Sequence, residues 1–164
     1  MGKNMDDING LDLNYFVSTA IAEVFETMLS IDLKELDSDC RVEMEGNTIT
    51  GTVSFAGKIM GNFNFVSTEK CARMLTVAML GMEENEIEGQ EEINDVIGEL
   101  SNMIGGDIKS RFCDSGFETQ LSIPSITSGS DYKIQTRDFA KKERYIFEHK
   151  EHKIIVEIFI KPGG

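Results

Sequence analysis

The sequence predicts an α+β fold in which two long helices pack on an antiparallel β-sheet. Two segments, residues 13–29 and 91–111, repeat apolar side chains at the spacing of one helix face. Shorter segments have the pattern of strands, and glycine-containing pairs separate several of them. A length of 164 residues suits one hydrophobic core, so we expect residues 1–164 to form a single domain.

The first half of the chain opens with the helix expected over residues 13–29. Its apolar side chains recur every three or four residues, as they do on the buried face of an amphipathic helix. The four expected to face the core are Val17, Ile21, Val24 and Met28.

Three strand patterns follow this first helix. Pairs that contain glycine separate them and are typical of the tight turns of an antiparallel meander. The turns are expected at Gly46-Asn47 and Ala56-Gly57, and the strands over residues 41–45, 47–55 and 58–66.

A shorter helix is expected to end the first half. Ser67 and Thr68 each offer a side-chain oxygen as an N-cap, and Gly81 can end the helix after Leu80. Residues 82–90 are rich in glutamate, so we expect them to form an exposed connector.

The second half begins with the long helix over residues 91–111. Strand patterns follow it, and the last is expected to be a hairpin because a charged pair, Lys150-Glu151, interrupts it. The expected ranges are 117–123, 132–137 or slightly longer, and 144–160 for the hairpin.

The order of elements is similar in the two halves, about residues 11–81 and 90–161, which indicates an internal duplication. Glu23 and Glu99 coincide when the two long helices are aligned, together with the aliphatic positions around them. Two copies related by a pseudo-twofold axis would lay both helices on one continuous sheet. The aligned segments are 19–26 with 95–102 and 58–65 with 153–160.

Composition restricts the classes of partner. A net charge of −13 disfavours nucleic acid and anionic membrane surfaces, because their phosphate groups repel an acidic protein. Cys40, Cys71 and Cys113 lack metal-ligand spacing and are expected to be reduced thiols. The apolar runs are too short to cross a bilayer, and the first residues are too acidic for a secretory signal, so we expect a cytoplasmic protein.

One side of the helix over residues 91–111 carries a line of polar residues. Asp95, Glu99 and Asn102 follow one another at i, i+4 and i+7, and therefore share a face. An apolar stripe occupies the other side, so the polar line is expected to face solvent. The stripe consists of Ile93, Ile97, Leu100, Ile104 and Ile108.

Gly98, Gly105 and Gly106 interrupt the same helix, where each glycine costs about 1 kcal/mol relative to alanine. Two interpretations are open. The glycines could admit the backbone of a partner, or they could let the helix lie tightly on the sheet or on the first helix.

The polar line resembles the motif of chemotaxis phosphatases of the CheX, CheC and FliY type. In that family, Asp or Ser is followed by x3-Glu-x2-Asn and, further along the chain, by a proline. Asp95, Glu99, Asn102 and Pro124 match this pattern, and the duplicated layout extends the resemblance over essentially the whole chain.

The resemblance implies a CheC-like pseudo-twofold fold and a phosphatase that hydrolyses the aspartyl phosphate of a CheY-like response regulator. Asn102 would orient the attacking water, and Glu99 would bind the lysine of the receiver domain. The receiver would supply Mg²⁺, so the chain would need no metal or cofactor of its own. The supporting residues would be Asp95, Gly98, Gly106 and Pro124.

The first half matches the motif only in part. Glu23 stands where the family can carry a second catalytic glutamate, but Glu26 replaces the asparagine and Thr19 the preceding acid. These residues would form a degenerate second site, and one intact site is the arrangement of CheX rather than of CheC. The resemblance also implies a homodimer.

Other interpretations stay open at this point. A non-catalytic module could dock the same helix on a response regulator or a flagellar-switch component, and a structural dimerisation domain could carry the same solvated face. His149 and His152 lie in a charged turn with Glu148 and Glu151, but their spacing matches no standard set of metal ligands.

Overall fold

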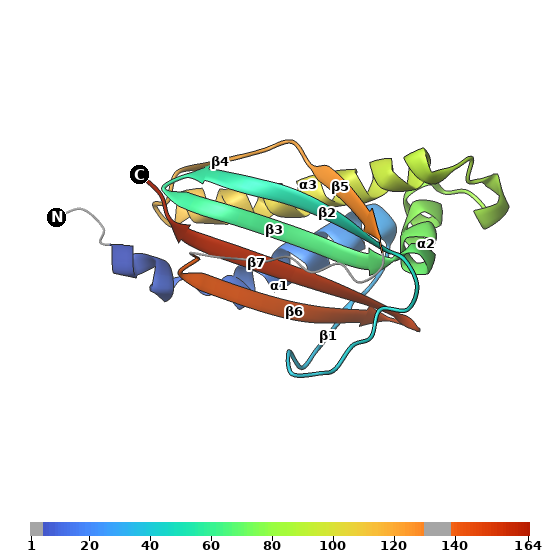
Figure 1. Cartoon of the computed structure of the whole chain (residues 1–164), viewed down its shortest axis with the longest axis horizontal. Coiled ribbons are helices and arrows are strands. Elements are labelled where there is room, and N and C mark those ends of the chain that lie inside the picture. The colour runs from blue at the N-terminus through green and yellow to red at the C-terminus, as the bar shows by residue number, and fades with distance from the viewer. Residues whose placement is uncertain (1–4, 130–138) are drawn as a thin grey trace.

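The chain forms one antiparallel sheet with helices α1 and α3 along one face and α2 at one end (Figure 1). This computed structural model describes residues 5–129 and 139–164. No helix in these two ranges is long and apolar enough to span a bilayer. The helical segments are η1 (Met5–Gly10), α1 (Leu13–Val24), η2 (Phe25–Leu29), α2 (Glu69–Leu80), η3 (Glu84–Glu86) and α3 (Gln90–Asp114).

The sheet has the order β1-β6-β7-β3-β2, and the short strands β4 and β5 both pair with the outer edge of β2. Every pairing is antiparallel. The strands are β1 (Lys34–Leu36), β2 (Thr48–Gly57), β3 (Ile59–Thr68), β4 (Thr119–Leu121), β5 (Ser125–Gly129), β6 (Lys141–His149) and β7 (His152–Pro162).

This order confirms the pseudo-twofold arrangement expected from the sequence. Exchange of the two halves maps β3 onto β7, β2 onto β6, and β1 onto the edge formed by β4 and β5. Phe63 and Ile158, which occupy the same position in the aligned last strands, are direct cross-strand partners. The pseudo-twofold axis therefore passes between these two residues, at the centre of the sheet.

Most of the expected elements are confirmed, and their ends differ by a few residues. The hairpin of β6 and β7 turns at Lys150 and Glu151, where Lys150 has φ 54°. At the start of α2, the Thr68 hydroxyl accepts a hydrogen bond from the Cys71 backbone N–H at 3.1 Å, so Thr68 is the N-cap. Gly81 ends that helix in the left-handed conformation, with φ 63°.

The expectation that Met28 faces the core was wrong, because this residue is 44% exposed. The helix over residues 13–29 is α-helical only to Val24, and Phe25–Leu29 form a π turn. A π turn holds more residues than an α turn, so successive side chains are separated by a smaller angle about the helix axis. Leu29 consequently takes the buried direction and Met28 turns outward.

Two of the strand expectations were wrong. Residues 41–45 form no strand, and the outer edge of β6 pairs with β1, which the sequence pattern missed. The strand expected over residues 117–123 is shorter, since β4 ends at Leu121 and a separate strand, β5, begins at Ser125. The strand expected over residues 132–137 lies outside the described residues.

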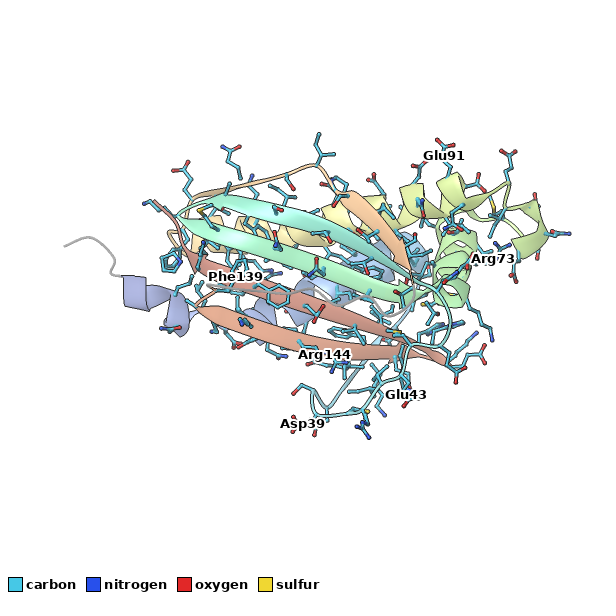
Figure 2. The ribbon with its side chains drawn as sticks, viewed as in Figure 1. Asp39, Glu43, Arg73, Glu91, Phe139 and Arg144 are labelled. Atoms are coloured by element: carbon cyan, nitrogen blue, oxygen red, sulfur yellow. The ribbon has the colours of Figure 1, made fainter. Side chains whose placement is uncertain are left out.

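Over β2 and β3, the sheet face away from α1 and α3 carries polar side chains. Thr52 donates a hydrogen bond to Asn64 at 2.7 Å, and Ser54 donates one to Asn62 at 2.9 Å. Arg144 projects from β6 on this face (Figure 2), opposite Glu157 on β7. The apolar core therefore lies between the sheet and the helices.

Helix α3 lies against β2 at two points of close approach. A Cβ atom on Gly105 would come within 2.5 Å of Val53 Cγ2, and one on Gly51 would overlap the Ser101 hydroxyl. Tight packing on the sheet thus explains Gly105. At Gly106, by contrast, an added Cβ would meet no atom of the described residues within 4 Å.

Substitution of the two adjacent glycines tests this packing. We expect Gly105→Ala to lower the free energy of unfolding by about 1–3 kcal/mol, because Val53 is branched and cannot move aside easily. Gly106→Ala should raise it by up to about 1 kcal/mol, since alanine favours the helix and has room. Urea denaturation measures both, and equal effects of the two substitutions would contradict the packing.

Candidate functional site

The outer side of α3 and the adjacent edge of the sheet form a shallow depression of about 610 Å³. Helix α3 and strand β5 run beside each other along this edge (Figure 1). The depression brings together the motif residues of the helix and the segment around Pro124, although these are far apart in the sequence. It is lined by Asn94, Asp95, Gly98, Glu99 and Asn102 of α3, and by Leu121, Ser122, Ile123, Pro124 and Ile126.

A bulge between β4 and β5 forms one wall of the depression. Leu121 pairs with Phe55 and Ser125 with Thr52, so three residues of this edge stand opposite two residues of β2. Ser122 anchors the bulge to Ser54, because its N–H donates to the Ser54 carbonyl and its hydroxyl accepts from the Ser54 N–H, both at 2.9 Å. Such bulges bend an edge strand and re-aim its side chains.

Pro124 lies next to Gly98 in the lining of the depression. A Cβ atom on Gly98 would lie 3.9 Å from Pro124 Cγ and 3.7 Å from Ile126 Cδ1, which is ordinary contact. The two predicted supporting residues are therefore neighbours, although close approach does not require glycine at position 98.

Asp95, Glu99 and Asn102 confirm the predicted polar face, since all three side chains are exposed and the apolar stripe of α3 is buried. None of the three makes a hydrogen bond or ion pair with another residue in the described ranges. Their polar atoms are available to a partner, and Glu99 and Asn102 lie about one helical turn apart.

The residue types indicate what this site can do. The Glu99 carboxylate can accept hydrogen bonds from a cation, and the Asn102 amide can accept with its oxygen while it donates with its nitrogen. Among the described residues that line the depression, Ser122 carries the only hydroxyl, and this hydroxyl already accepts from the Ser54 N–H and donates to the Ile123 carbonyl. The groups of the described lining that are left for a partner are therefore the Asp95 and Glu99 carboxylates and the Asn102 amide, which can bind and orient another molecule.

The first-half residues do not join this site. Glu23 forms an ion pair with Arg111 of α3, with Oε1 3.7 Å from Nη2, and Arg111 also binds Asp107 at 3.2 Å. The Arg111 guanidinium lies 5.7 Å from the centre of the Tyr15 ring. Glu23 therefore joins α1 to α3, in agreement with the degenerate motif around it.

Glu26 lies apart from both Glu23's ion pair and the depression. Its side chain is exposed on η2, beside a small hollow that it shares with Ser30, Ile31 and Asp32. No amide is among the described residues that line this hollow, so the Glu and Asn pair of the family motif has no counterpart in that lining.

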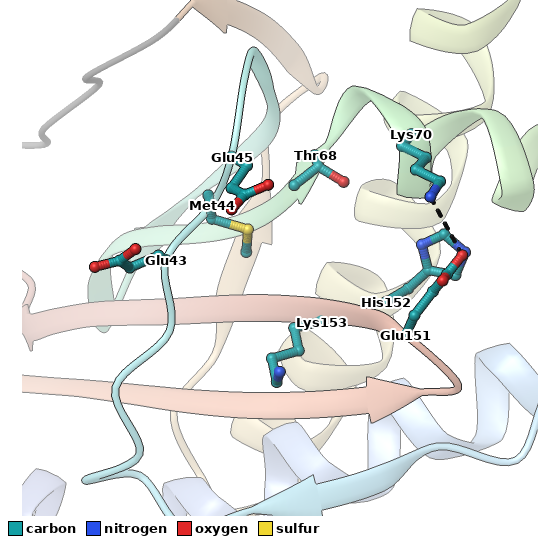
Figure 3. Close-up of a pocket in the computed structure, with 8 residues that line it drawn as sticks. All are labelled: Glu43, Met44, Glu45, Thr68, Lys70, Glu151, His152 and Lys153. Carbon is teal, nitrogen blue, oxygen red and sulfur yellow. Dashed lines mark ion pairs between the residues drawn. The ribbon is translucent and has the colours of Figure 1, made fainter.

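The histidine turn forms a separate hollow with the start of α2 (Figure 3). Lys70 Nζ lies 3.3 Å from Glu151 Oε1, and His152 Nε2 lies 3.9 Å from the same oxygen. Within residues 5–129 and 139–164, no three His, Cys, Asp or Glu side chains are grouped so as to hold a metal ion. The ion pair joins the turn between β6 and β7 to α2.

Comparison with known proteins gives a match to one family and a match to a curated relative. A family model described as chemotaxis phosphatase CheX matches residues 49–150, which is more than half of the chain. A curated relative, the CheY-P phosphatase CheX of Thermotoga maritima, is 28% identical over 126 residues, which make up 73% of this chain and 79% of the relative.

Solved structures share the fold. The chemotaxis protein CheX of Vibrio vulnificus has a TM-score of 0.78 at 22% identity, and the match covers 92% of this chain and 97% of that one. The CheX chain in a CheX-CheY-BeF3-Mg²⁺ complex of Borrelia burgdorferi has a TM-score of 0.72 at 19% identity, over 92% and 98% of the two chains. At these identities the likeness establishes the fold alone.

The position of His152 in the hollow at the histidine turn predicts how folding stability depends on pH. Burial lowers the pKa of His152 below its ordinary value of 6.5, and the Glu151 carboxylate opposes this shift. As the pH falls through this region, the unfolded chain takes up the proton first, so folding stability should decrease. NMR titration should give His152 a pKa below 6.5, and Glu151→Gln should lower it further. A value at or above 6.5 would contradict this description.

Proposed function

This chain belongs to the CheX family of chemotaxis phosphatases, and we propose that it hydrolyses the aspartyl phosphate of a CheY-like response regulator. One observation carries the proposal. The exposed Glu99 and Asn102 side chains lie about one turn apart on α3, unpaired within the described residues, beside the bulge that contains Pro124.

The chemistry of the substrate explains why two such groups suffice. An aspartyl phosphate is an activated acyl phosphate, and its hydrolysis needs a water molecule in line with the bond from phosphorus to the aspartate oxygen. Water attacks phosphorus, that bond breaks, and the aspartate leaves as a carboxylate while inorganic phosphate forms. The receiver's Mg²⁺ and lysine neutralise the phosphoryl oxygens, so this chain supplies no metal or cofactor.

Asn102 is the catalytic residue of the proposal. Its amide oxygen accepts a hydrogen bond from the attacking water, which fixes the water in line with the bond that breaks. An amide does not need to change protonation to do this. The family motif, with its asparagine at this position, supports the assignment.

Glu99 sets the docking register. Its carboxylate forms a charge-assisted hydrogen bond with the receiver's lysine, one helical turn from Asn102. Asp95, one turn further toward the start of α3, supports the site by repelling acidic groups in wrong registers. Gly98 and Pro124 form the wall of the depression, and Gly106 leaves open space for the partner on the same side of the helix.

The Borrelia burgdorferi structure supports the choice of partner, since its name joins CheX to CheY with BeF3 and Mg²⁺. Further support comes from the described residues that line the depression, because the carboxylates of Asp95 and Glu99 and the amide of Asn102 can bind and orient a partner. We also propose that the protein acts in the cytoplasm as a homodimer, as the family resemblance implies.

Hydrolysis kinetics test the catalytic assignment. The wild type should accelerate the decay of a ³²P-labelled CheY-like receiver. Asn102→Ala should lower kcat by about 100-fold or more, because the attacking water loses its orientation. Glu99→Ala should lower kcat/KM by roughly 10- to 100-fold, since it loses a charge-assisted hydrogen bond.

Glu23→Ala is the matched control, because Glu23 holds the equivalent position in α1 but pairs with Arg111. We expect it to retain wild-type kinetics within a factor of two. Full activity of Asn102→Ala would refute its role. Binding of the phosphorylated receiver without faster decay would instead support a non-catalytic binding module.

The proposed homodimer has a direct test. Sedimentation equilibrium at micromolar concentration should give twice the chain mass of 18.3 kDa. A mass equal to that of one chain over the whole concentration range would show that the protein is a monomer.

A further inference from the structure

Ile123 is the most exposed large hydrophobic side chain in the described part of the chain, at 88%. Single exposed apolar residues are common on proteins, so this exposure alone carries no function. The position of the side chain makes it unusual, because Ile123 is the middle residue of the bulge between β4 and β5 and lines the same depression as Glu99 and Asn102.

The fold explains the bulge itself. Leu121 and Ile126 both reach toward α3, with Leu121 Cδ1 near Gly105 and Ile126 Cδ1 near Gly98. They are five residues apart, and strict strand alternation would place them on opposite faces of the sheet. The extra residue of the bulge restores the alternation, so that both can pack on the helix.

The fold does not explain the isoleucine. The backbone of the bulge is held by Ser122, through the two hydrogen bonds with Ser54, and the side chain at position 123 makes no such bond. A polar residue at the exposed tip would leave these interactions intact and would be better hydrated. Because this exposed isoleucine lines the same depression as Glu99 and Asn102, it offers apolar contact area to a partner that docks at those two residues.

The side chain is also held in place before any partner arrives. Pro124 follows it, and a residue before proline is restricted to extended conformations. Isoleucine is branched at Cβ, which restricts its χ1 angle. A side chain restricted in this way loses little conformational entropy on binding.

The neighbours of Ile123 indicate the chemistry of the partner. The apolar Leu121 and Pro124 line the depression together with Ile123, and so do the carboxylate residues Asp95 and Glu99. A fitting surface presents an apolar hollow next to a cationic group. Under the proposed function, the receiver's lysine is that cationic group, and it stands beside the phosphorylated aspartate.

We propose that Ile123 is an apolar anchor for the phosphorylated receiver, inserted into an apolar hollow beside the receiver's lysine. This inference rests on the proposed function and adds a specificity-determining residue to it. The anchor and Glu99 hold the receiver at two points of different chemistry. Glu99 sets the register in which Asn102 meets the attacking water, and Ile123 adds apolar contact that strengthens binding. Receivers with a polar or charged surface at the hollow would bind weakly.

Truncation of the side chain tests the anchor. Ile123→Ala should raise the Kd for a beryllofluoride-activated receiver, and the KM for the phosphorylated receiver, by about 10-fold or more. It should leave kcat within a factor of two, because the groups around the water are unchanged. Ile123→Val, which removes one CH₂ and keeps most of the apolar surface, should stay within about 4-fold of wild type in Kd.

Met60→Ala is the matched control, since Met60 is an exposed apolar side chain, at 41%, on the face of the sheet away from the helices. It should change neither Kd nor KM. Unchanged Kd and KM for Ile123→Ala, with an active wild type, would overturn the anchor and leave the proposed function intact. A fall in kcat at constant KM would overturn it as well. A wild type that neither binds nor dephosphorylates any receiver would refute the proposed function, and the anchor with it.

Discussion

The close contact between α3 and β2 is the constraint on which the rest of the site depends. Gly105 lies against Val53 and Gly51 lies against Ser101, so the helix cannot rotate or lift without a clash or a cavity. This contact fixes which side of α3 points to solvent, and it directs Glu99 and the rest of the polar line outward. The precision of the site therefore comes from backbone packing, since the polar side chains themselves have no partners among the described residues.

The sheet edge completes the site from a distant part of the sequence. The bulge between β4 and β5 lets two apolar side chains pack on α3 and pushes Ile123 into solvent. The pseudo-twofold fold offers an equivalent helix position at Glu23, but there the carboxylate pairs with Arg111 and stabilises the contact between α1 and α3. The second half of the chain thus holds the proposed catalytic residues, while the equivalent glutamate of the first half makes a contact between two helices.

The sequence predicted regular elements better than it predicted their interruptions. Periodicity identified both long helices and the polar face around Glu99, because burial of an apolar stripe determines the orientation of a helix. It missed the π turn that exposes Met28 and the short strand β1, since both depend on tertiary contacts. The motif located Pro124, but Ile123 was missed. The only local signal of the bulge was that Leu121 and Ile126 are separated by an odd number of positions, five. This separation indicates a bulge only once both side chains are known to face the same helix.

The most direct test of the account is a crystal structure of this protein bound to a beryllofluoride-activated receiver. We expect the Asn102 side chain to lie within about 3 Å of a water in line with the bond from beryllium to the aspartate oxygen. We also expect the receiver's lysine to contact Glu99. A receiver docked on α1 at Glu23, or on the sheet face opposite the helices, would contradict the account.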